Sequence, residues 1–517
     1  MITTETAIYF GLTQNIYSCL YSTVNTSMDA VFLSSCIPEN LTTLFRPLGP
    51  YQVAWYLRKH GYSAQVIDFI FKMTTDEILD LIDKFVTKDT KVLGIGFMIG
   101  IHNKNMGAMI IKFENVLLKA KKRYPWIKTI VGSGAALFWS RRHRNATLFD
   151  YVLAGHAENS TLALFNYLYR GAPMPPFELI DGNKVIRETF TMPDGNLFNI
   201  EDSAHVWHDS DCIQPNETLP LELGRGCIFK CKFCRYPYIG KHKNDFNRSM
   251  DCVKEELIDN YNRWGTTNYY MLDDTFNADK ERLKKFTEMT RTLPFKINYA
   301  TYLRADLIHA NPETEELLQE SGLLACYLGI ETLNKDAANL IGKPWSAKHA
   351  KDYLPKLFHD KWNKEISVIL GLIAGLPPET LDECKQTNKW IKENELSGMF
   401  WYSLNIDRNA HSQYRSDFDI NAENYGFRWV VKEGRPIWET DYCDEIIAQE
   451  WQVELMAEAK AYSNIAAWYL LELGNYGYDL QETKQLKMVD AGMRKTVPPL
   501  RKTWYETYIA QLKSLPV

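Results

Sequence analysis

The chain has 517 residues, too many for one ordinary domain, so we expect about two to four domains. Apolar residues make up 45% of the sequence and charged residues 24%, which supplies ample material for globular cores. The net charge of −5 argues against a general nucleic-acid-binding surface, because such surfaces need a basic footprint. No apolar run reaches about 18 residues, so we expect no membrane span.

Residues 1–27 lack both a basic start and a continuous apolar stretch, so we expect an N-terminal extension rather than a signal peptide. The sequence contains 10 cysteines and no recognisable secretion signal. This combination favours a reducing compartment, and we therefore expect a cytoplasmic protein.

Residues 28–172 alternate between short apolar runs and amphipathic segments. The apolar runs predict strands at residues 30–33, 64–69, 92–97, 129–134 and 151–158. The amphipathic segments predict helices at residues 51–60, 76–86, 106–123 and 159–169. Strands that alternate with helices of this length predict a parallel, doubly wound, Rossmann-like sheet with right-handed connections.

Glycine residues stand at the ends of three successive predicted strands. They are Gly94 and Gly96, Gly132 and Gly134, and Gly155. The carboxyl ends of parallel strands share one edge of the sheet, where ligands bind and where glycine permits close approach to the backbone. We predict a ligand at this edge; the alternative is that these glycines serve ordinary tight turns.

A connector and a second alternating series follow the first sheet. Residues 173–216 contain several Pro and Gly turns, with a predicted hairpin tip at Gly182-Asn183, and are expected to link two domains. Predicted strands then cover residues 219–223, 269–272, 296–302, 325–329, 366–372 and 399–406. Predicted helices between them include residues 252–264, 280–292 and 314–321. Residues 416–517 are expected to form a helical C-terminal domain, with helices at 443–473 and 482–493.

The loop after the first strand of this second series carries three cysteines. Cys227, Cys231 and Cys234 form a C-x3-C-x2-C pattern. A structural zinc site wants four ligands, so three thiolates in one loop make a poor zinc site. They suit a four-iron cluster in which three irons are held by cysteine and the fourth is open to a small molecule.

A strand that feeds this cysteine loop, an aromatic Phe233 just before the third cysteine and the alternating elements that follow resemble the radical S-adenosylmethionine (SAM) superfamily. The resemblance implies a partial (β/α)6 TIM-like barrel over residues 217–415. It also implies a [4Fe–4S] cluster on the three cysteines, at which SAM is reductively cleaved to a 5′-deoxyadenosyl radical.

The resemblance further implies SAM-binding roles for residues at the predicted strand ends. Asp273 or Asp274 would pair with the ammonium group of SAM, and Arg304 would pair with its carboxylate. Glu331 would accept from the ribose hydroxyls or the ammonium. The backbone through Gly371, Ile373 and Gly375 would pack against the adenine.

Residues 28–172 resemble the cobalamin-binding domain that precedes the barrel in many radical enzymes. The resemblance rests on the predicted helix at 50–61, on the segment 131–134 and on the turn 155–158. It implies cobalamin at the glycine edge, with contacts from Gly96, Gly132, Gly134 and Gly155. The D-x-H-x-x-G motif, whose His binds cobalt in many such domains, is absent after the first strand. His102 is a candidate neighbour of a corrin, or else an exposed loop residue.

The leading hypothesis is a cobalamin-dependent radical SAM methyltransferase that acts on an unactivated carbon. The alternatives are a cobalamin-independent enzyme, in which hydrogen abstraction leads to rearrangement, cyclisation or oxidation, and a protein whose cluster is only structural. We expect a monomer that takes a small-molecule or peptide substrate and electrons from a flavodoxin- or ferredoxin-like donor. Candidate substrate contacts are Arg408, His411, Tyr414 and Arg415. Cys443 is either a second catalytic thiol or a packed side chain.

Overall fold

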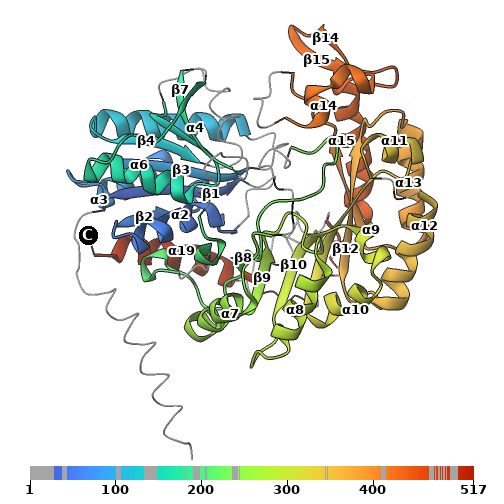
Figure 1. Cartoon of the computed structure of the whole chain (residues 1–517), viewed down its shortest axis with the longest axis horizontal. Coiled ribbons are helices and arrows are strands. Elements are labelled where there is room, and N and C mark those ends of the chain that lie inside the picture. Colours follow the sequence, from blue (N-terminus) through green and yellow to red (C-terminus); the bar gives the residue numbers. More distant parts are fainter. Residues whose placement is uncertain are drawn as a thin grey trace, which may run out of the picture.

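The computed structural model consists of two α/β units, each built on a mainly parallel sheet, that lie side by side (Figure 1). The structure describes residues 28–37, 44–99, 106–132, 148–180, 182–189, 198–203, 207–235, 241, 243, 245–343, 345, 347–408 and 415–464, parts of 471–488, and 499–516. No helix in these ranges is long and apolar enough to cross a membrane.

The first unit is a seven-stranded sheet in the order β2-β1-β3-β4-β5-β7-β6. Its strands are β1 (Ala30–Ile37), β2 (Ala64–Ile67), β3 (Val92–Ile99), β4 (Lys128–Gly132), β5 (Tyr151–Gly155), β6 (Glu178–Ile180) and β7 (Asn183–Glu188). The connecting helices are α2 (Leu48–Lys59), α3 (Thr75–Phe85), α4 (Met106–Arg123) and α6 (Glu158–Arg170). The first five strands are parallel, which confirms the doubly wound sheet, and the strand order reverses between β1 and β3.

The connector contributes to this sheet, which corrects the expected boundary at residue 172. A hairpin between β6 and β7 has its tip where the sequence predicts it, but β7 also pairs in parallel with β5. Val185 and Ile186 of β7 are buried, and the pairing covers the edge that β5 would otherwise expose. The first unit therefore continues to about residue 188.

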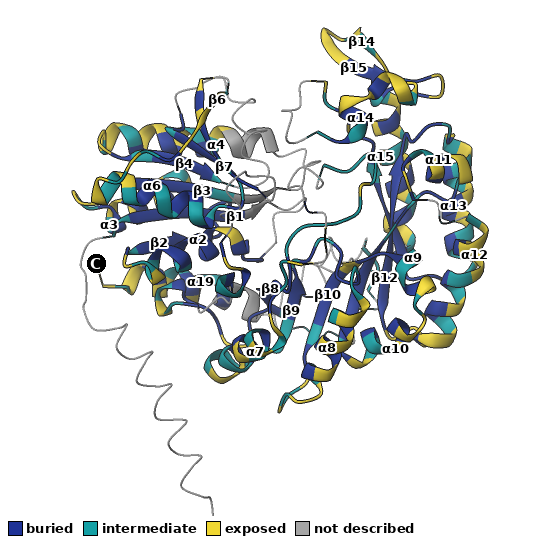
Figure 2. Ribbon diagram, in the orientation of Figure 1, coloured by how far each residue is buried: buried dark blue, intermediate teal, exposed yellow. Residues whose placement is uncertain are grey.

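The second unit is a six-stranded parallel sheet in the sequential order β8 to β13. Its strands are β8 (Leu219–Leu221), β9 (Asn268–Met271), β10 (Asn298–Leu303), β11 (Leu323–Glu331), β12 (Ser367–Ala374) and β13 (Gly398–Ser403). Its helices include α7 (Met250–Trp264), α8 (Lys280–Thr290), α9 (Ala305–Ala310), α10 (Glu313–Glu320), α11 (Lys335–Leu340), α12 (Ala347–Lys356) and α13 (Leu381–Glu393). The buried strands and the partly exposed outer helices are those of the expected partial barrel (Figure 2).

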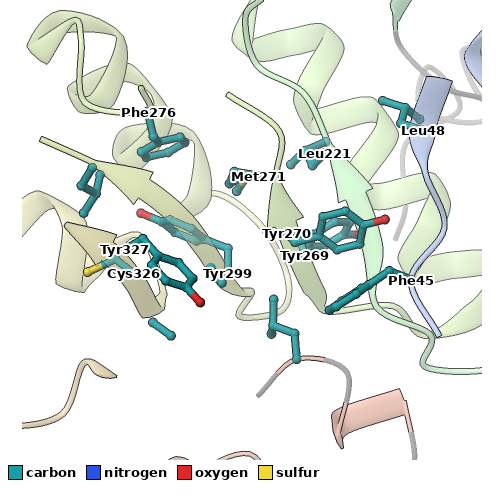
Figure 3. Close-up of a cluster of buried hydrophobic side chains, with 14 of the residues drawn as sticks. Phe45, Leu48, Leu221, Tyr269, Tyr270, Met271, Phe276, Tyr299, Cys326 and Tyr327 are labelled. Carbon is teal, nitrogen blue, oxygen red and sulfur yellow. The ribbon is translucent and has the colours of Figure 1, made fainter. Parts of the chain in front are cut away.

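A buried aromatic cluster joins the two units (Figure 3). The rings of Phe45, from the first unit, and Tyr270, on β9, lie 5.0 Å apart edge to face. Leu48, Leu221 and Tyr269 belong to the same continuous core. Because apolar area removed from water stabilises at about 25 cal/mol per Å², this contact favours fixed docking of the two units.

The C-terminal residues are divided between the two units, although the sequence suggested one helical domain. Helix α15 (Glu445–Tyr462) covers the edge strand β13, whose backbone N–H groups at Met399 and Trp401 donate to Ser463 Oγ (2.9 Å) and Met456 Sδ (3.1 Å). The short helix α14 (Asp417–Ile420) and an unpredicted hairpin of β14 (Arg428–Lys432) and β15 (Arg435–Glu439) precede α15. The predicted helix at 482–493 lies mostly outside the described residues.

The last described helix, α19 (Pro499–Ser514), returns to the first unit and lies beside β2 and α2 (Figure 1). It helps to enclose Arg46, whose side chain is fully buried and pairs with the equally buried Glu217 at 2.6 Å. Arg46 also donates to Tyr51 Oη and to the carbonyl of Asp211. The aromatic rings within 6.0 Å of its guanidinium carbon are those of Tyr51, Phe69, Trp504 and Tyr508. We call the Arg46–Glu217 pair the Arg46 lock; it connects the first unit to the residues that enter β8.

Candidate active site

The cysteine loop follows β8 at the carboxyl edge of the barrel sheet. Cys227, Cys231 and Cys234 are partly buried, and none of them forms a disulfide. The N–H of Cys234 donates to the carbonyl of Cys231 (3.0 Å), and the N–H of Lys232 donates to the carbonyl of Ile341 (3.0 Å). These backbone bonds hold the loop as a tight turn against the residues that follow α11.

Two side chains from the barrel contact the thiols. Thr275 Oγ1, just beyond β9, lies 3.4 Å from Cys227 Sγ, and burial raises the pKa of the Cys227 thiol. Arg304 Nη1 lies 3.5 Å from Cys231 Sγ, and its guanidinium stacks on the ring of Phe229 at 4.1 Å. Arg304 thus places a positive charge beside the sulfur of Cys231, one of the three that would bind iron.

The donor set of this loop fits a [4Fe–4S] cluster with one open iron. Three cysteines on one loop supply three thiolates, and the loop itself adds no fourth cysteine. Among the described residues, no three Cys, His, Asp or Glu side chains are already gathered closely enough to hold a metal ion. The three thiols would therefore have to turn toward one another to ligate the cluster.

The two acidic residues after β9 differ in their surroundings. Asp273 is 2% exposed, forms an ion pair with Arg282 (2.7 Å) and accepts from the backbone N–H of Leu223 (3.0 Å). Asp274 instead accepts from the N–H of Gly226, next to Cys227 (3.0 Å). Burial and the charge of Asp273 raise the pKa of Asp274 to about 7. Asp273 is thus committed to holding the end of β8, whereas Asp274 faces the cysteine loop.

Arg304 and Glu331 lie at the ends of β10 and β11, and each already has an ionic partner. Arg304 forms a bidentate pair with Asp306, with N–O distances of 3.0 and 2.6 Å. Glu331 has a positive φ of 68° and pairs with Lys343 Nζ at 2.7 Å. Lys343 also donates to the carbonyl of Gly329 (2.9 Å) and is 9% exposed. The sequence interpretation missed Lys343, because its contact with Glu331 crosses a loop that carries no local motif.

The three positions on and after β12 serve different purposes. Gly371 pairs in register with Gly329, and a Cβ at Gly371 would meet its nearest atom only at 3.7 Å. Ile373 is buried in the same strand. Gly375 has a φ of 90°, and a Cβ there would lie 2.6 Å from the Cβ of Ala448 on α15. Gly375 is therefore required for helix packing, a role that the sequence interpretation did not predict.

Helix α14 braces the cysteine loop from the C-terminal side. Lys232 pairs with Asp417 at 2.7 Å, and Arg235 forms a bidentate pair with the buried Asp419 at 2.9 and 3.1 Å. Asp419 also accepts from the backbone N–H of Asp407 (2.7 Å). It thus ties the segment after β13 to the loop that carries the cysteines.

The candidate substrate residues are only partly described. Arg408 is exposed, and Arg415 donates to the carbonyl of Asp419 (3.0 Å), whereas His411 and Tyr414 lie outside the described residues. Cys443 is 6% exposed, and burial raises the pKa of its thiol to about 12. A thiol that stays protonated is a poor nucleophile, so Cys443 is a packed side chain.

At the carboxyl edge of the first sheet, the glycines are not equivalent. A Cβ at Gly96 would lie 2.7 Å from Pro50 of α2, and Gly155, with a φ of 94°, lies against the carbonyl of Glu188. Gly94 does not end its strand as the sequence predicted: β3 continues to Ile99, and Gly94 lies inside the sheet between Phe32 and Ile130. At Gly132, in contrast, a Cβ would meet no atom of the described residues within 4 Å. Within the part of the chain that the structure describes, Gly132 therefore has open space at the edge, where a flat ligand could lie on the backbone; Gly134 and His102 lie outside the described residues.

These features define a protein in which a three-cysteine loop stands at the mouth of a partial α/β barrel, behind a doubly wound α/β unit. Residues 221–391 match the family described as the Radical SAM superfamily, so this part of the chain is a radical SAM domain. Such a domain implies a [4Fe–4S] cluster and SAM as cofactors.

Two solved proteins share the fold of nearly the whole chain. The first is the radical SAM methyltransferase TsrM from Kitasatospora setae with cobalamin and a [4Fe–4S] cluster bound (12% identity, TM-score 0.61, 94% of this chain and 99% of that chain). A second TsrM structure holds a tryptophan substrate and a SAM analogue (11% identity, TM-score 0.60, 94% and 99%). The other protein is the cobalamin-dependent SAM radical enzyme OxsB with aqua-cobalamin bound (14% identity, TM-score 0.55, 97% and 81%). At these identities the likeness establishes the fold.

Among curated proteins, the heme chaperone HemW of Buchnera aphidicola is 23% identical over 203 residues. The match covers 36% of this chain and spans half the length of that protein.

Proposed function

We propose that this protein is a cobalamin-dependent radical SAM methyltransferase that methylates an unactivated carbon of a small-molecule or peptide substrate. The observation that carries the proposal is the combination of a cysteine loop at the barrel mouth with a second, glycine-lined edge on a doubly wound sheet. The fold shared with TsrM over 94% of the chain supports it. When bound, the cluster supplies the electron that splits SAM into methionine and a 5′-deoxyadenosyl radical, and cobalamin supplies the methyl group.

The proposed roles of the chain's own residues at the barrel mouth follow from their charges. Cys227, Cys231 and Cys234 hold the cluster. Asp274, which contacts the cysteine loop, receives the ammonium of SAM, and Arg304, which contacts Cys231, receives its carboxylate. In addition, Glu331 accepts from the ribose hydroxyls while Lys343 fixes its orientation. The adenine is assigned to β12 at Gly371 and Ile373, because a Cβ at Gly371 would meet its nearest atom only at 3.7 Å, and Asp273 and Gly375 act as structural residues.

The first sheet has features that suit a corrin. The strand order reverses between β1 and β3, which is the point where doubly wound sheets bind ligands. The open space at Gly132 lies on the same carboxyl edge. Gly96 brings α2 close to this edge through its contact with Pro50, and Gly155 shapes the neighbouring turn.

The proposed partners and location follow from the chemistry. A low-potential donor of the flavodoxin or ferredoxin class would reduce the cluster. A reducing, cytoplasmic location fits the eight described cysteines, none of which forms a disulfide.

The test uses full-length protein, purified anaerobically from cells supplied with cobalamin and then reconstituted with iron and sulfide. It is incubated with a reductant and with SAM that carries an isotopically labelled methyl group. The proposal predicts that 5′-deoxyadenosine forms and that labelled methyl appears on the bound cobalamin. Failure to form 5′-deoxyadenosine on an intact cluster would refute the radical chemistry.

A second function is favoured by one observation, the absence of the D-x-H-x-x-G motif after β1. In this alternative the first sheet keeps its fold without cobalamin, and hydrogen abstraction leads to rearrangement, cyclisation or oxidation. An intact cluster and 5′-deoxyadenosine formation without any corrin in the purified protein would favour this alternative over methyl transfer.

A further inference from the structure

The turn after β5 is joined to the cysteine loop by one arginine. Arg225, two positions before Cys227, forms a bidentate pair with Glu158, the first residue of α6, at 2.9 and 3.2 Å. It forms a second bidentate pair with Glu222 at 2.7 and 2.9 Å. Its remaining N–H group points at His156 Nδ1, 3.1 Å away. We call Arg225, Glu158 and Glu222 the Arg225 bridge.

His156 accepts from Arg225 as a neutral ring. Burial and the charge of Arg225 lower the pKa of His156 to about 3. Because an arginine only donates, the Nδ1 atom that faces it has to be the acceptor. The guanidinium of Arg225 is therefore satisfied on every side by groups of fixed geometry.

Residues of the connector and of the barrel also surround Arg225. Its guanidinium stacks on the ring of Phe198, from the connector, at 4.7 Å. Phe198 in turn contacts Phe246, which lies just before α7 (5.6 Å). Lys241 Nζ donates to the carbonyl of Arg225 (2.9 Å). The first sheet, the connector and the barrel thus meet at this one side chain.

The Arg46 lock and the Arg225 bridge stand at opposite ends of the short strand β8. Glu217 of the lock precedes β8, whereas Arg225 follows it. The lock is fully buried, while the side chain of Arg225 is 21% exposed. Loss of the bridge would leave the lock and the aromatic core intact. The two units would stay docked but could tilt about the amino end of β8, which changes their separation at the carboxyl edges.

We propose that the Arg225 bridge is a positioning device that sets the distance between the ligand edge of the first sheet and the cysteine loop. This inference rests on the proposed function, because that distance matters only when both edges carry a cofactor. In this proposal, Glu158 binds Arg225 of the cysteine loop and does not bind a ligand at the edge of the first sheet. Two bidentate carboxylate–guanidinium pairs on one arginine fix both the position and the angle of α6 relative to the cysteine loop, whereas a single ion pair would fix only a distance.

The test compares Arg225→Met, Arg225→Lys and Glu158→Gln in the full-length chain carrying cluster and cobalamin. Arg263→Met is the matched control, because Arg263 also joins connector and barrel, through Trp207 O (2.6 Å) and Asp209 (2.7 Å). The measurement is the magnetic interaction between cob(II)alamin and the reduced cluster in electron paramagnetic resonance, which depends steeply on their separation.

The inference predicts a several-fold change in this interaction in Arg225→Met and Glu158→Gln, a smaller change in Arg225→Lys, and none in Arg263→Met. Iron and corrin contents should match the wild type. An interaction equal to that of the wild type in both Arg225→Met and Glu158→Gln would overturn the inference. If Arg225→Met does not assemble its cluster, Glu158→Gln decides alone, because that change lies in the other unit.

A wild-type protein that binds no corrin would refute the proposed function, and the bridge would then be tested without it. Amide hydrogen exchange of the cluster-loaded chain should become faster in both residues 156–165 and residues 225–235 when Arg225 is replaced by Met. Unchanged exchange in either segment would count against the bridge itself.

Discussion

The two carboxyl edges of this protein are built from different materials. The barrel edge carries reactive and charged side chains: three cysteines, Asp274, Arg304 and Glu331. In the described part of the first-sheet edge, the predicted contacts are glycines, and the clearest opening is the space beside Gly132. Both edges were predicted from the sequence, but the roles of reactive side chains could be assigned from a motif, whereas the space beside a backbone glycine depends on how the fold packs around it. The proposed roles of the two edges can be tested separately, by substitutions at one edge at a time.

The largest effect is expected on the barrel side. Replacing Cys231 by Ala should abolish both the brown colour of the cluster and the formation of 5′-deoxyadenosine, because two thiolates cannot hold three irons. Cys252→Ala is the control, since Cys252 lies on α7 and contacts Arg248 rather than the loop. Iron analysis and an assay of SAM cleavage measure both variants. A full four-iron cluster in Cys231→Ala would refute the ligand assignment.

The next largest effect should come from the buried connection between the units. Arg46→Met leaves Glu217 buried without its cation, which should destabilise the fold by about 3–5 kcal/mol. The double variant Arg46→Met/Glu217→Gln should recover part of this loss, because no unpaired charge remains. Thermal unfolding of the single and double variants measures the difference. Equal midpoints for the wild type and Arg46→Met would show that the lock contributes nothing.

The substitution Gly132→Val tests whether the first-sheet edge binds corrin independently of SAM cleavage at the barrel edge. The added side chain would fill space that no described residue occupies, so it should weaken corrin binding by at least about tenfold, or roughly 1.4 kcal/mol. The cluster and SAM cleavage should remain, because Gly132 ends β4 in the first sheet and the cysteine loop belongs to the barrel. Corrin absorbance after equilibrium dialysis gives the affinity. Wild-type affinity in this variant would move the proposed cobalamin site away from β4.

The smallest effect concerns the pH dependence of stability. Burial and the nearby Glu158 raise the pKa of Glu188 to about 7, while Arg225 and the N–H of Ser160 act in the opposite direction. An acid whose pKa is raised in the folded state stabilises the fold at low pH, and this contribution is lost as the pH rises through about 7. Glu188→Gln should therefore remove the loss of stability that this group causes between about pH 5 and 8.

Thermal midpoints measured over this pH range test the Glu188 prediction. Glu178→Gln is the control, because Glu178 lies in the same hairpin but its side chain is exposed and pairs with Arg187. Parallel curves for the wild type and Glu188→Gln would contradict the assignment of a raised pKa to this carboxyl group.

The sequence predicted those features that depend on local patterns. Helix α4 has the predicted bounds, 106–123, because its amphipathic period and its flanking breakers are local signals. The cysteine loop was predicted from spacing alone, and its place after the first strand of a parallel barrel sheet is confirmed. The roles of individual SAM-binding and corrin-binding residues remain predictions.

Other features depend on contacts between distant residues and left no local signal. Arg225 and Glu158 are 67 positions apart, and their pairing depends on how the two units dock. The sequence motif suggested that Gly375 contacts the adenine of SAM. It gave no sign that Gly375 also packs against Ala448 of α15, where a larger side chain would not fit. Strand β7 pairs with β5 and so extends the first sheet. The Pro and Gly residues of the connector gave no sign of this pairing.

The most direct test of the account is the cofactor content of a single preparation. Full-length protein, expressed with cobalamin and purified without oxygen, should contain one four-iron cluster and one cobalt per chain after gel filtration. Iron and cobalt analysis on the same sample measures this content. A full complement of iron with no cobalt would contradict the claim that the first sheet and the barrel act as two cofactor edges of one enzyme.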